Sequence, residues 1–235
     1  MFIGHFAVGF AAKKFNSKPS LGTYFLAAQL LDLLWPTFLL LGIEQAEISH
    51  DAANPIPLSF THYPISHSLL TVIGWGVLFA LIYSLTKKNY KEAVLLGLCV
   101  VSHWLLDLVV HIPDLPLYPG NSILVGLGLW KFKLVELLVE FALFTAGIAF
   151  YLTSTTAKNK TGLYATWSLI IFLMVIHLMN TFGAAPPDMK AVAWAGQLQW
   201  LFIIWAYWSD RNRKVKDEEV KQETKTATRI SQNTS

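Results

Sequence analysis

The chain has 235 residues, of which 54% are hydrophobic and 14% are charged. Soluble domains carry about 25% charged residues, so this composition excludes an ordinary soluble globular domain. The formal net charge of +3 at pH 7 gives no basis for nucleic-acid binding.

Six segments are long and apolar enough to cross a membrane, since a helical span needs about 20 mostly apolar residues. Before them, Phe2–Ala12 is apolar but too short to cross, and we expect an interfacial or re-entrant helix. Long apolar runs without strict alternation argue against strands. The sequence therefore predicts an all-α polytopic membrane helical bundle of about six transmembrane helices. The expected spans are Leu21–Ile43, Ser66–Thr86, Glu92–Ile112, Lys133–Thr153, Gly162–Phe182 and Ala191–Trp208.

Basic residues divide unevenly between the two sets of connections that these spans create. Of the 18 Lys and Arg residues, only Lys131, Lys133 and Lys190 lie on one side. Because basic residues are enriched in cytoplasmic loops, we expect a multi-pass protein of the plasma (inner) membrane with both termini in the cytoplasm. Residues 1–208 then form an integral membrane domain. Residues 209–235 form a polar cytoplasmic tail, which we expect to be largely disordered.

Several ionisable residues lie within the expected spans. A charged group at the centre of a bilayer costs roughly 2.5–3.5 kcal/mol on insertion scales, so such groups persist when they are paired, ligated or facing water. With the expected topology, all of them fall at the midplane or in the outer half of the membrane, which favours one polar cluster. They are Asp32, His67, His103, Asp107, His111, Glu136, Glu140 and His177.

The spacing of these residues indicates shared helix faces. His103, Asp107 and His111 follow one another at intervals of four residues, as do Glu136 and Glu140, and residues four apart lie on the same side of a helix. Imidazole and carboxylate ligands suit zinc, manganese or iron. A proton relay uses the same residue types, so spacing alone leaves both a metal-dependent enzyme and a transporter open.

Four stretches of the first half of the chain share the order of a known set of motifs. They are GHFAVGFAAK (Gly4–Lys13), QLLDLLWP (Gln29–Pro36), HYPISHSLL (His62–Leu70) and SHWLLD (Ser102–Asp107). In these stretches the chain resembles the membrane-bound metal-dependent hydrolase family. The family pattern has an early His, an Asp motif, a His-Arg-Gly-x-Thr-His-Ser motif and a Ser-His-x-x-x-Asp motif. The resemblance implies one or two divalent ions, zinc or manganese, held by His5, Asp32, His62, His67, His103 and Asp107.

Two departures from the family pattern bear on the expected site. Leu30 stands where the family often has a second Asp, so one carboxylate is missing. Tyr63 and Pro64 replace the Arg-Gly pair, which removes an anion-binding Arg. Glu136 or Glu140 could supply the missing ligand.

Three functions fit the sequence. The first is a hydrolase that acts on a lipid or amphiphilic substrate, with a phosphoester as the preferred class and Asp107 or Glu136 as the catalytic proton acceptor. The second is a proton- or ion-coupled transporter that uses the same intramembrane residues. The third is a non-catalytic scaffold whose tail binds a cytoplasmic partner. Membrane lipids are the expected partners in each case, and the sequence gives no oligomeric state.

Overall fold

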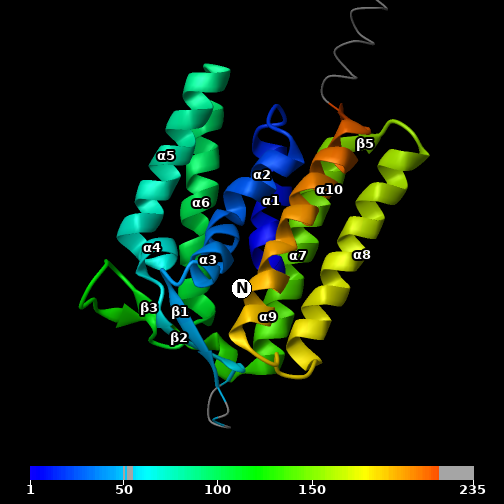
Figure 1. The fold of residues 1–235 in the computed structure, drawn as a ribbon. Coiled ribbons are helices and arrows are strands. Elements are labelled where there is room, and N and C mark those ends of the chain that lie inside the picture. The colour runs from blue at the N-terminus through cyan, green and yellow to red at the C-terminus, as the bar shows by residue number, and fades with distance from the viewer. Residues whose placement is uncertain (50, 52–54, 217–235) are drawn as a thin grey trace, which may run out of the picture.

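Helices dominate the computed structural model, which describes residues 1–49, 51 and 55–216 (Figure 1). The described part confirms the prediction of an all-α helical bundle. Its helices are α1 (Ile3–Phe15), α2 (Leu21–Ala28), α3 (Leu30–Leu40), α4 (Pro64–His67), α5 (Leu69–Lys87), α6 (Tyr90–Val110), α7 (Lys133–Ser154), α8 (Lys160–Phe182), α9 (Met189–Gln197) and α10 (Gln199–Arg211), with a 3-10 turn, η1, at Leu129–Lys131.

Four of the described helices, α5, α6, α7 and α8, are long and apolar enough to cross a membrane. The pair α2 and α3, bent by 55°, makes up to a fifth span. This count is lower than the six spans expected from sequence, because Ala191–Trp208 is divided at Leu198 into two short helices. The first of these, α9, packs on α3 so closely that a Cβ at Gly196 would lie 2.5 Å from the ring of Pro36.

The outer surface of α5 shows how these helices meet their surroundings. Only 11% of the apolar stretch of α5 is buried within the molecule. Large apolar side chains project from it, among them Leu70, Val77, Leu81 and Leu85, each more than half exposed. Because soluble monomers rarely expose such large apolar surfaces, this surface identifies a membrane protein.

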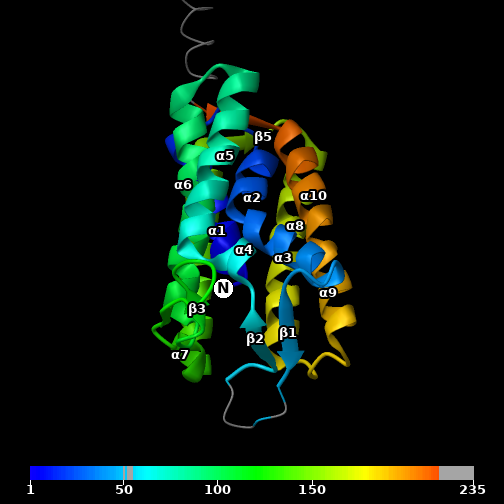
Figure 2. The ribbon, with the colours of Figure 1, turned by 60° about the vertical axis from the view of Figure 1, so that its left-hand side comes forward.

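The short N-terminal helix α1 lies at the centre of the bundle, against α7, α2 and α6 (Figures 1 and 2). Phe6 and Phe10 are fully buried in an aromatic core with Phe25 and Phe144. Close approach depends on Gly147 of α7, where an added Cβ would lie 2.5 Å from the carbonyl oxygen of Ala7. Small residues permit such approaches between membrane helices. This burial favours the re-entrant alternative for Phe2–Ala12 over the interfacial one.

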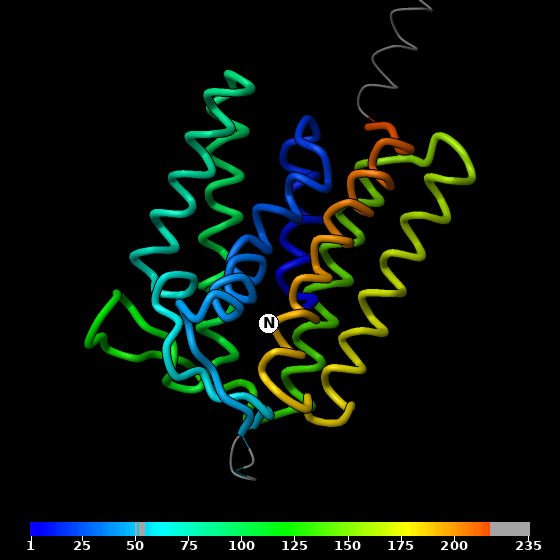
Figure 3. The backbone as a smooth tube through the Cα atoms, in the orientation of Figure 1, coloured from blue at the N-terminus to red at the C-terminus, as the bar shows by residue number. Residues whose placement is uncertain are grey.

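The tube in Figure 3 shows that the α1–α2, α5–α6 and α7–α8 connections lie at one end of the bundle. These connections carry most of the lysines outside the C-terminal tail, so the structure gathers at one end the basic residues that the sequence assigns to the cytoplasm. The orientation relative to the membrane stays a prediction. Met1 lies within the bundle, about midway between the two ends.

Among the described residues, strands occur only outside the long helices, in agreement with strand-free spans. An antiparallel hairpin of β1 (Gln45–Ile48) and β2 (Leu58–His62) projects from the end opposite the lysine-rich connections. β3 (Leu115–Pro116) pairs with β4 (Leu124–Val125), and β5 (Thr155–Ala157) pairs with β6 (Arg213–Val215).

The expected domain boundary at residues 208 and 209 falls inside α10. Beyond it, Arg213 of β6 is buried and donates hydrogen bonds to the side chain and carbonyl of Thr155. Asp210 forms a 2.9 Å ion pair with Lys13 of α1. The first residues of the expected tail are therefore part of the bundle, and residues 217–235 lie outside the described part of the chain.

Candidate metal centre

Five ionisable side chains from four helices meet inside the bundle. His5 comes from the first turn of α1, Asp32 from the first turn of α3, His67 from the last residue of α4, and His103 and Asp107 from α6. Donor atoms of His5, Asp32 and His103 lie within 4.8 Å of one another, and so do donor atoms of His67, His103 and Asp107. We call these five residues the central cluster. It contains five of the six metal ligands expected from sequence.

Local structure explains how each segment delivers its side chain. The bend between α2 and α3 turns the chain just before Asp32. Pro64 begins α4, where its fixed φ suits the first helical turn. The helix ends after His67, at Ser68, whose side chain caps α5. The four-residue spacing on α6 places His103 and Asp107 on one face.

The distances within the central cluster suit a single metal ion. His103 Nε2 lies 3.2 Å from Asp107 Oδ2 and 3.5 Å from Asp32 Oδ1. His67 Nε2 lies 3.8 Å and 3.6 Å from the same two oxygen atoms. Ligands bound to tetrahedral zinc at about 2.0–2.1 Å are about 3.3–3.4 Å apart. The four imidazole–carboxylate distances, at 3.2–3.8 Å, are therefore close to the spacing of ligands around a metal ion.

Contacts behind the two imidazoles fix their orientation. His103 Nδ1 lies 2.7 Å from the carbonyl oxygen of Ala28, so it carries the proton and Nε2 is left free to accept. His67 Nδ1 lies 2.7 Å from Ser66 Oγ, which donates to Glu44 Oε2 at 2.5 Å. A ring nitrogen held in this way, by a carbonyl or through a carboxylate, is the usual arrangement behind a metal-binding histidine.

The second carboxylate oxygen of Asp107 contacts the N-terminal helix instead of His67 and His103. Oδ1 lies 3.1 Å from His5 Nε2 and accepts from the amino group of Met1 at 2.6 Å. The ring of His5 stacks on that of His103 with centroids 3.5 Å apart. Among the described residues, His5 Nδ1 and His103 Nε2 are buried ring nitrogens without a hydrogen-bond partner. Because buried polar atoms are nearly always satisfied, the free Nε2 facing two carboxylates fits a bound cation.

Access to the central cluster is one-sided. The side chain of Asp32 is 22% exposed, whereas those of His67 and Asp107 are 6% and 4% exposed. The cluster therefore opens on the side of α3, next to the bend.

His62, the sixth expected ligand, lies outside the cluster. It is exposed at the end of β2. The buried position is taken by its neighbour Tyr63, whose hydroxyl donates to the carbonyl oxygen of Asp114 at 3.1 Å. Burial, together with the carboxylate of Asp114, raises the pKa of Tyr63, which keeps the phenol a neutral donor. The family spacing is thus present, but the strand turns His62 away.

Two further residues considered from sequence also have other partners. His111, at the C-terminal end of α6, bonds to Asp114 through Nδ1 at 2.8 Å and packs against Trp130. Glu136, the second expected catalytic residue, belongs to a separate group with Glu140 and His177. Helical spacing places His111 on the same face of α6 as His103 and Asp107. However, α6 ends at Val110, and the His111 side chain bonds to the turn that follows.

Sequence reasoning missed the pair that supports His67. Glu44 is 1% exposed and accepts from the backbone amides of Ile65 and Ser66 as well as from the Ser66 hydroxyl. Glu44 directly follows the first expected span, outside the apolar segments whose ionisable residues predict the cluster. Ser66 stands directly before His67 within the third motif, which was the available signal.

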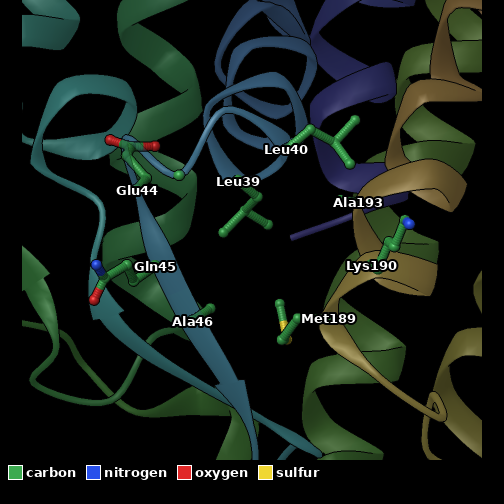
Figure 4. Close-up of a pocket in the computed structure, with 9 residues that line it drawn as sticks. Leu39, Leu40, Glu44, Gln45, Ala46, Met189, Lys190 and Ala193 are labelled. Carbon is green, nitrogen blue, oxygen red and sulfur yellow. The ribbon is translucent and has the colours of Figure 1, made fainter.

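A cavity of about 340 Å³ lies between the C-terminal end of α3, β1 and α9. Figure 4 shows Leu39, Leu40, Met189 and Ala193 around it, with Glu44 and the exposed Lys190 at its edge. The cavity is therefore mostly apolar with a cation at its rim.

The fold and the central cluster together define a helical membrane protein with a buried histidine–aspartate site between its helices. Residues 1–184 match the family model described as YdjM inner membrane protein. The chain belongs to this family, and the match includes every residue of the central cluster. Comparisons with curated proteins and with solved structures gave no match.

Proposed function

We propose that the protein is a metal-dependent hydrolase of the inner membrane that acts on a lipid or another amphiphile. The observation that supports it most strongly is that Nε2 of His67 and Nε2 of His103 each lie 3.2–3.8 Å from a carboxylate oxygen of Asp32 and of Asp107. Family membership supports the membrane location.

His67, His103, Asp32 and Asp107 would hold the ion, with His5 as a fifth candidate ligand. Mixed imidazole and carboxylate donors suit zinc or manganese. Such an ion, when bound, lowers the pKa of a coordinated water toward about 7 and polarises a phosphoryl or acyl oxygen.

The protein's own groups would handle the proton. His5 Nε2 is hydrogen-bonded to Asp107 at 3.1 Å, and its Nδ1 has no partner among the described residues. With His5 not bound to the ion, Nδ1 could accept the proton of the attacking nucleophile and return it to the leaving group, with Asp107 stabilising the charged ring. This differs from the sequence expectation, in which Asp107 itself accepts the proton. Glu136 belongs to the separate group and receives no role in this reaction.

The cavity beside α3 supports an amphiphilic substrate. Leu39 lies seven residues after Asp32 on the same helix, which is about 10 Å at 1.5 Å per residue. Apolar walls would hold a hydrocarbon chain, and Lys190 at the rim would attract an anionic group. A phosphoester headgroup is therefore the preferred substrate class.

Metal analysis of the detergent-purified protein tests the proposal. We expect zinc or manganese to copurify with the wild type, and both the His103→Ala and the Asp107→Ala variants to lose one ion per chain. His62→Ala, which changes an exposed histidine, is the matched control and should retain that ion. The proposed centre would be refuted if folded His103→Ala protein contained as much metal as the folded wild type.

A transporter is the second candidate, because the structure contains a broken helix beside the cluster. α2 and α3 are bent by 55° at Gln29, whose buried side-chain amide has no hydrogen-bond partner among the described residues. Discontinuous helices form binding sites in many transporters. Ion-coupled uptake by proteoliposomes that contain metal-free protein would favour this candidate, and lipid phosphoester hydrolysis that depends on added metal would favour the hydrolase.

A further inference from the structure

A second group of ligand-type side chains lies between α7 and α8. Glu136 and Glu140, one turn apart on α7, and His177 of α8 offer donor atoms within 4.8 Å of one another. Their exposed fractions are 7%, 1% and 2%. This group shares no residue with the central cluster.

Aromatic packing fixes the imidazole of this second group. The ring of His177 is parallel to that of Phe2, with centroids 6.3 Å apart, and meets the edge of Phe141 at 5.6 Å. Among the described residues, His177 Nε2 is buried without a hydrogen-bond partner. Held in this way beside two carboxylates, the ring offers a metal-binding nitrogen that no group in the described part of the chain satisfies.

The carboxylate of Glu140 has one identified function already. It accepts from the backbone amides of Phe2 at 3.0 and 3.1 Å and of Gly4 at 3.0 Å, so it caps the N-terminal end of α1. The same end of α1 carries the Met1 amino group that bonds to Asp107. The first residues of α1 therefore lie between the two groups and contact both.

The negative charges of Glu136 and Glu140 also favour a bound cation. The amino group of Met1 lies close enough to interact electrostatically with Glu140, but it is already paired with Asp107 at 2.6 Å. Two carboxylates buried close together therefore favour a further compensating cation, because an unpaired buried charge is costly. Lys133 stands one turn before Glu136, but its ammonium group lies over the ring of Phe182, 4.7 Å from the centroid. A divalent ion would neutralise the pair and also satisfy His177.

We propose that Glu136, Glu140 and His177 bind a second divalent cation, separate from the central cluster. Two carboxylates and one imidazole form a harder donor set than the central one, so manganese is the preferred ion, with zinc as the competitor. Because Glu140 also holds the first turn of α1, the ion would fix the helix that carries His5. The second site goes beyond the proposed hydrolysis and does not depend on it.

The test counts ions in the full-length protein after purification in detergent and exposure to Mn²⁺, using elemental analysis and the electron paramagnetic resonance signal of bound Mn²⁺. We expect two ions per chain in the wild type and one in His177→Phe, which keeps an aromatic ring between Phe2 and Phe141 but removes both nitrogens. Glu136→Gln, which keeps the side-chain shape, should also lose one ion. Glu47→Gln changes an exposed carboxylate and should lose none.

The two proposed sites fail in different ways. If His177→Phe and Glu136→Gln both keep the ion count of the wild type while His103→Ala loses one, the second site is refuted and the central one stands. If only the α7–α8 variants lose an ion, the central site is refuted. Thermal unfolding identifies a misfolded variant, and the other α7–α8 variant then decides the result.

Discussion

Replacing Gly147 by alanine should disturb the central cluster from a distance. The added Cβ would lie 2.5 Å from the carbonyl oxygen of Ala7, whereas ordinary contacts begin at 3.4 Å, so α1 and α7 must separate by about 0.9 Å. Overpacking costs about 1–3 kcal/mol, and alanine returns up to about 1 kcal/mol through its higher helix propensity. We expect a net loss of about 1–2 kcal/mol.

The same displacement should weaken metal binding. His5 is two residues from Ala7 on α1, and its 3.1 Å bond to Asp107 would be stretched. Metal sites tolerate deviations of only about 0.2 Å in ligand distance, and the loss of a supporting contact typically lowers metal affinity about 10–100-fold. We expect an effect of that size on the ion that depends on His103.

Thermal unfolding in detergent and metal titration measure both effects. A loss of 1–2 kcal/mol corresponds to a fall in Tm of about 2–8 °C for a chain of this size. Gly74→Ala is the matched control, because nothing lies within 4 Å of a Cβ at this exposed α5 position. It should leave Tm equal or slightly raised. If Gly147→Ala matched this control in both Tm and metal affinity, the packing of α1 described above would be wrong.

Three further substitutions test other parts of the structure. Ser66→Ala removes the link between Glu44 and His67 and should lower metal affinity about 10–100-fold. Ser102 bonds only to its own helix, so Ser102→Ala should leave metal affinity unchanged. Equal metal affinities of the two variants would contradict the supporting role of Ser66. Asp210→Asn leaves Lys13 buried without its counter-charge and should destabilise the protein by about 3–5 kcal/mol, so an unchanged Tm would show that this pair does not fasten α1 to α10. His62→Ala should keep the wild-type metal affinity while His67→Ala loses it, and the reverse result would favour the motif over the geometry.

The sequence predicts most of the central cluster because helix periodicity and membrane energetics act locally. His103 and Asp107 face one way because they are one turn apart, and Asp32 must be paired because it lies within an apolar span. These two rules, with the family motifs, identify five residues that the structure brings together.

The remaining differences arise from contacts between distant segments. His62 keeps its five-residue distance from His67, yet β2 pairs with β1 and exposes it. The last expected span is apolar apart from Gln197 and Gln199, and close packing of Gly196 on Pro36 accompanies its division into α9 and α10. Neither the pairing nor the packing is encoded in the spacing of nearby residues.

Two contacts of α1 have a consequence for biosynthesis. Phe2 is held by a residue 138 positions later in the chain, and Lys13 by one 197 positions later. While the nascent chain leaves the ribosome, the first helix has neither contact, and it can gain them only after α7 and α10 have been synthesised. The N-terminal helix α1 is therefore synthesised first but obtains its full set of contacts late.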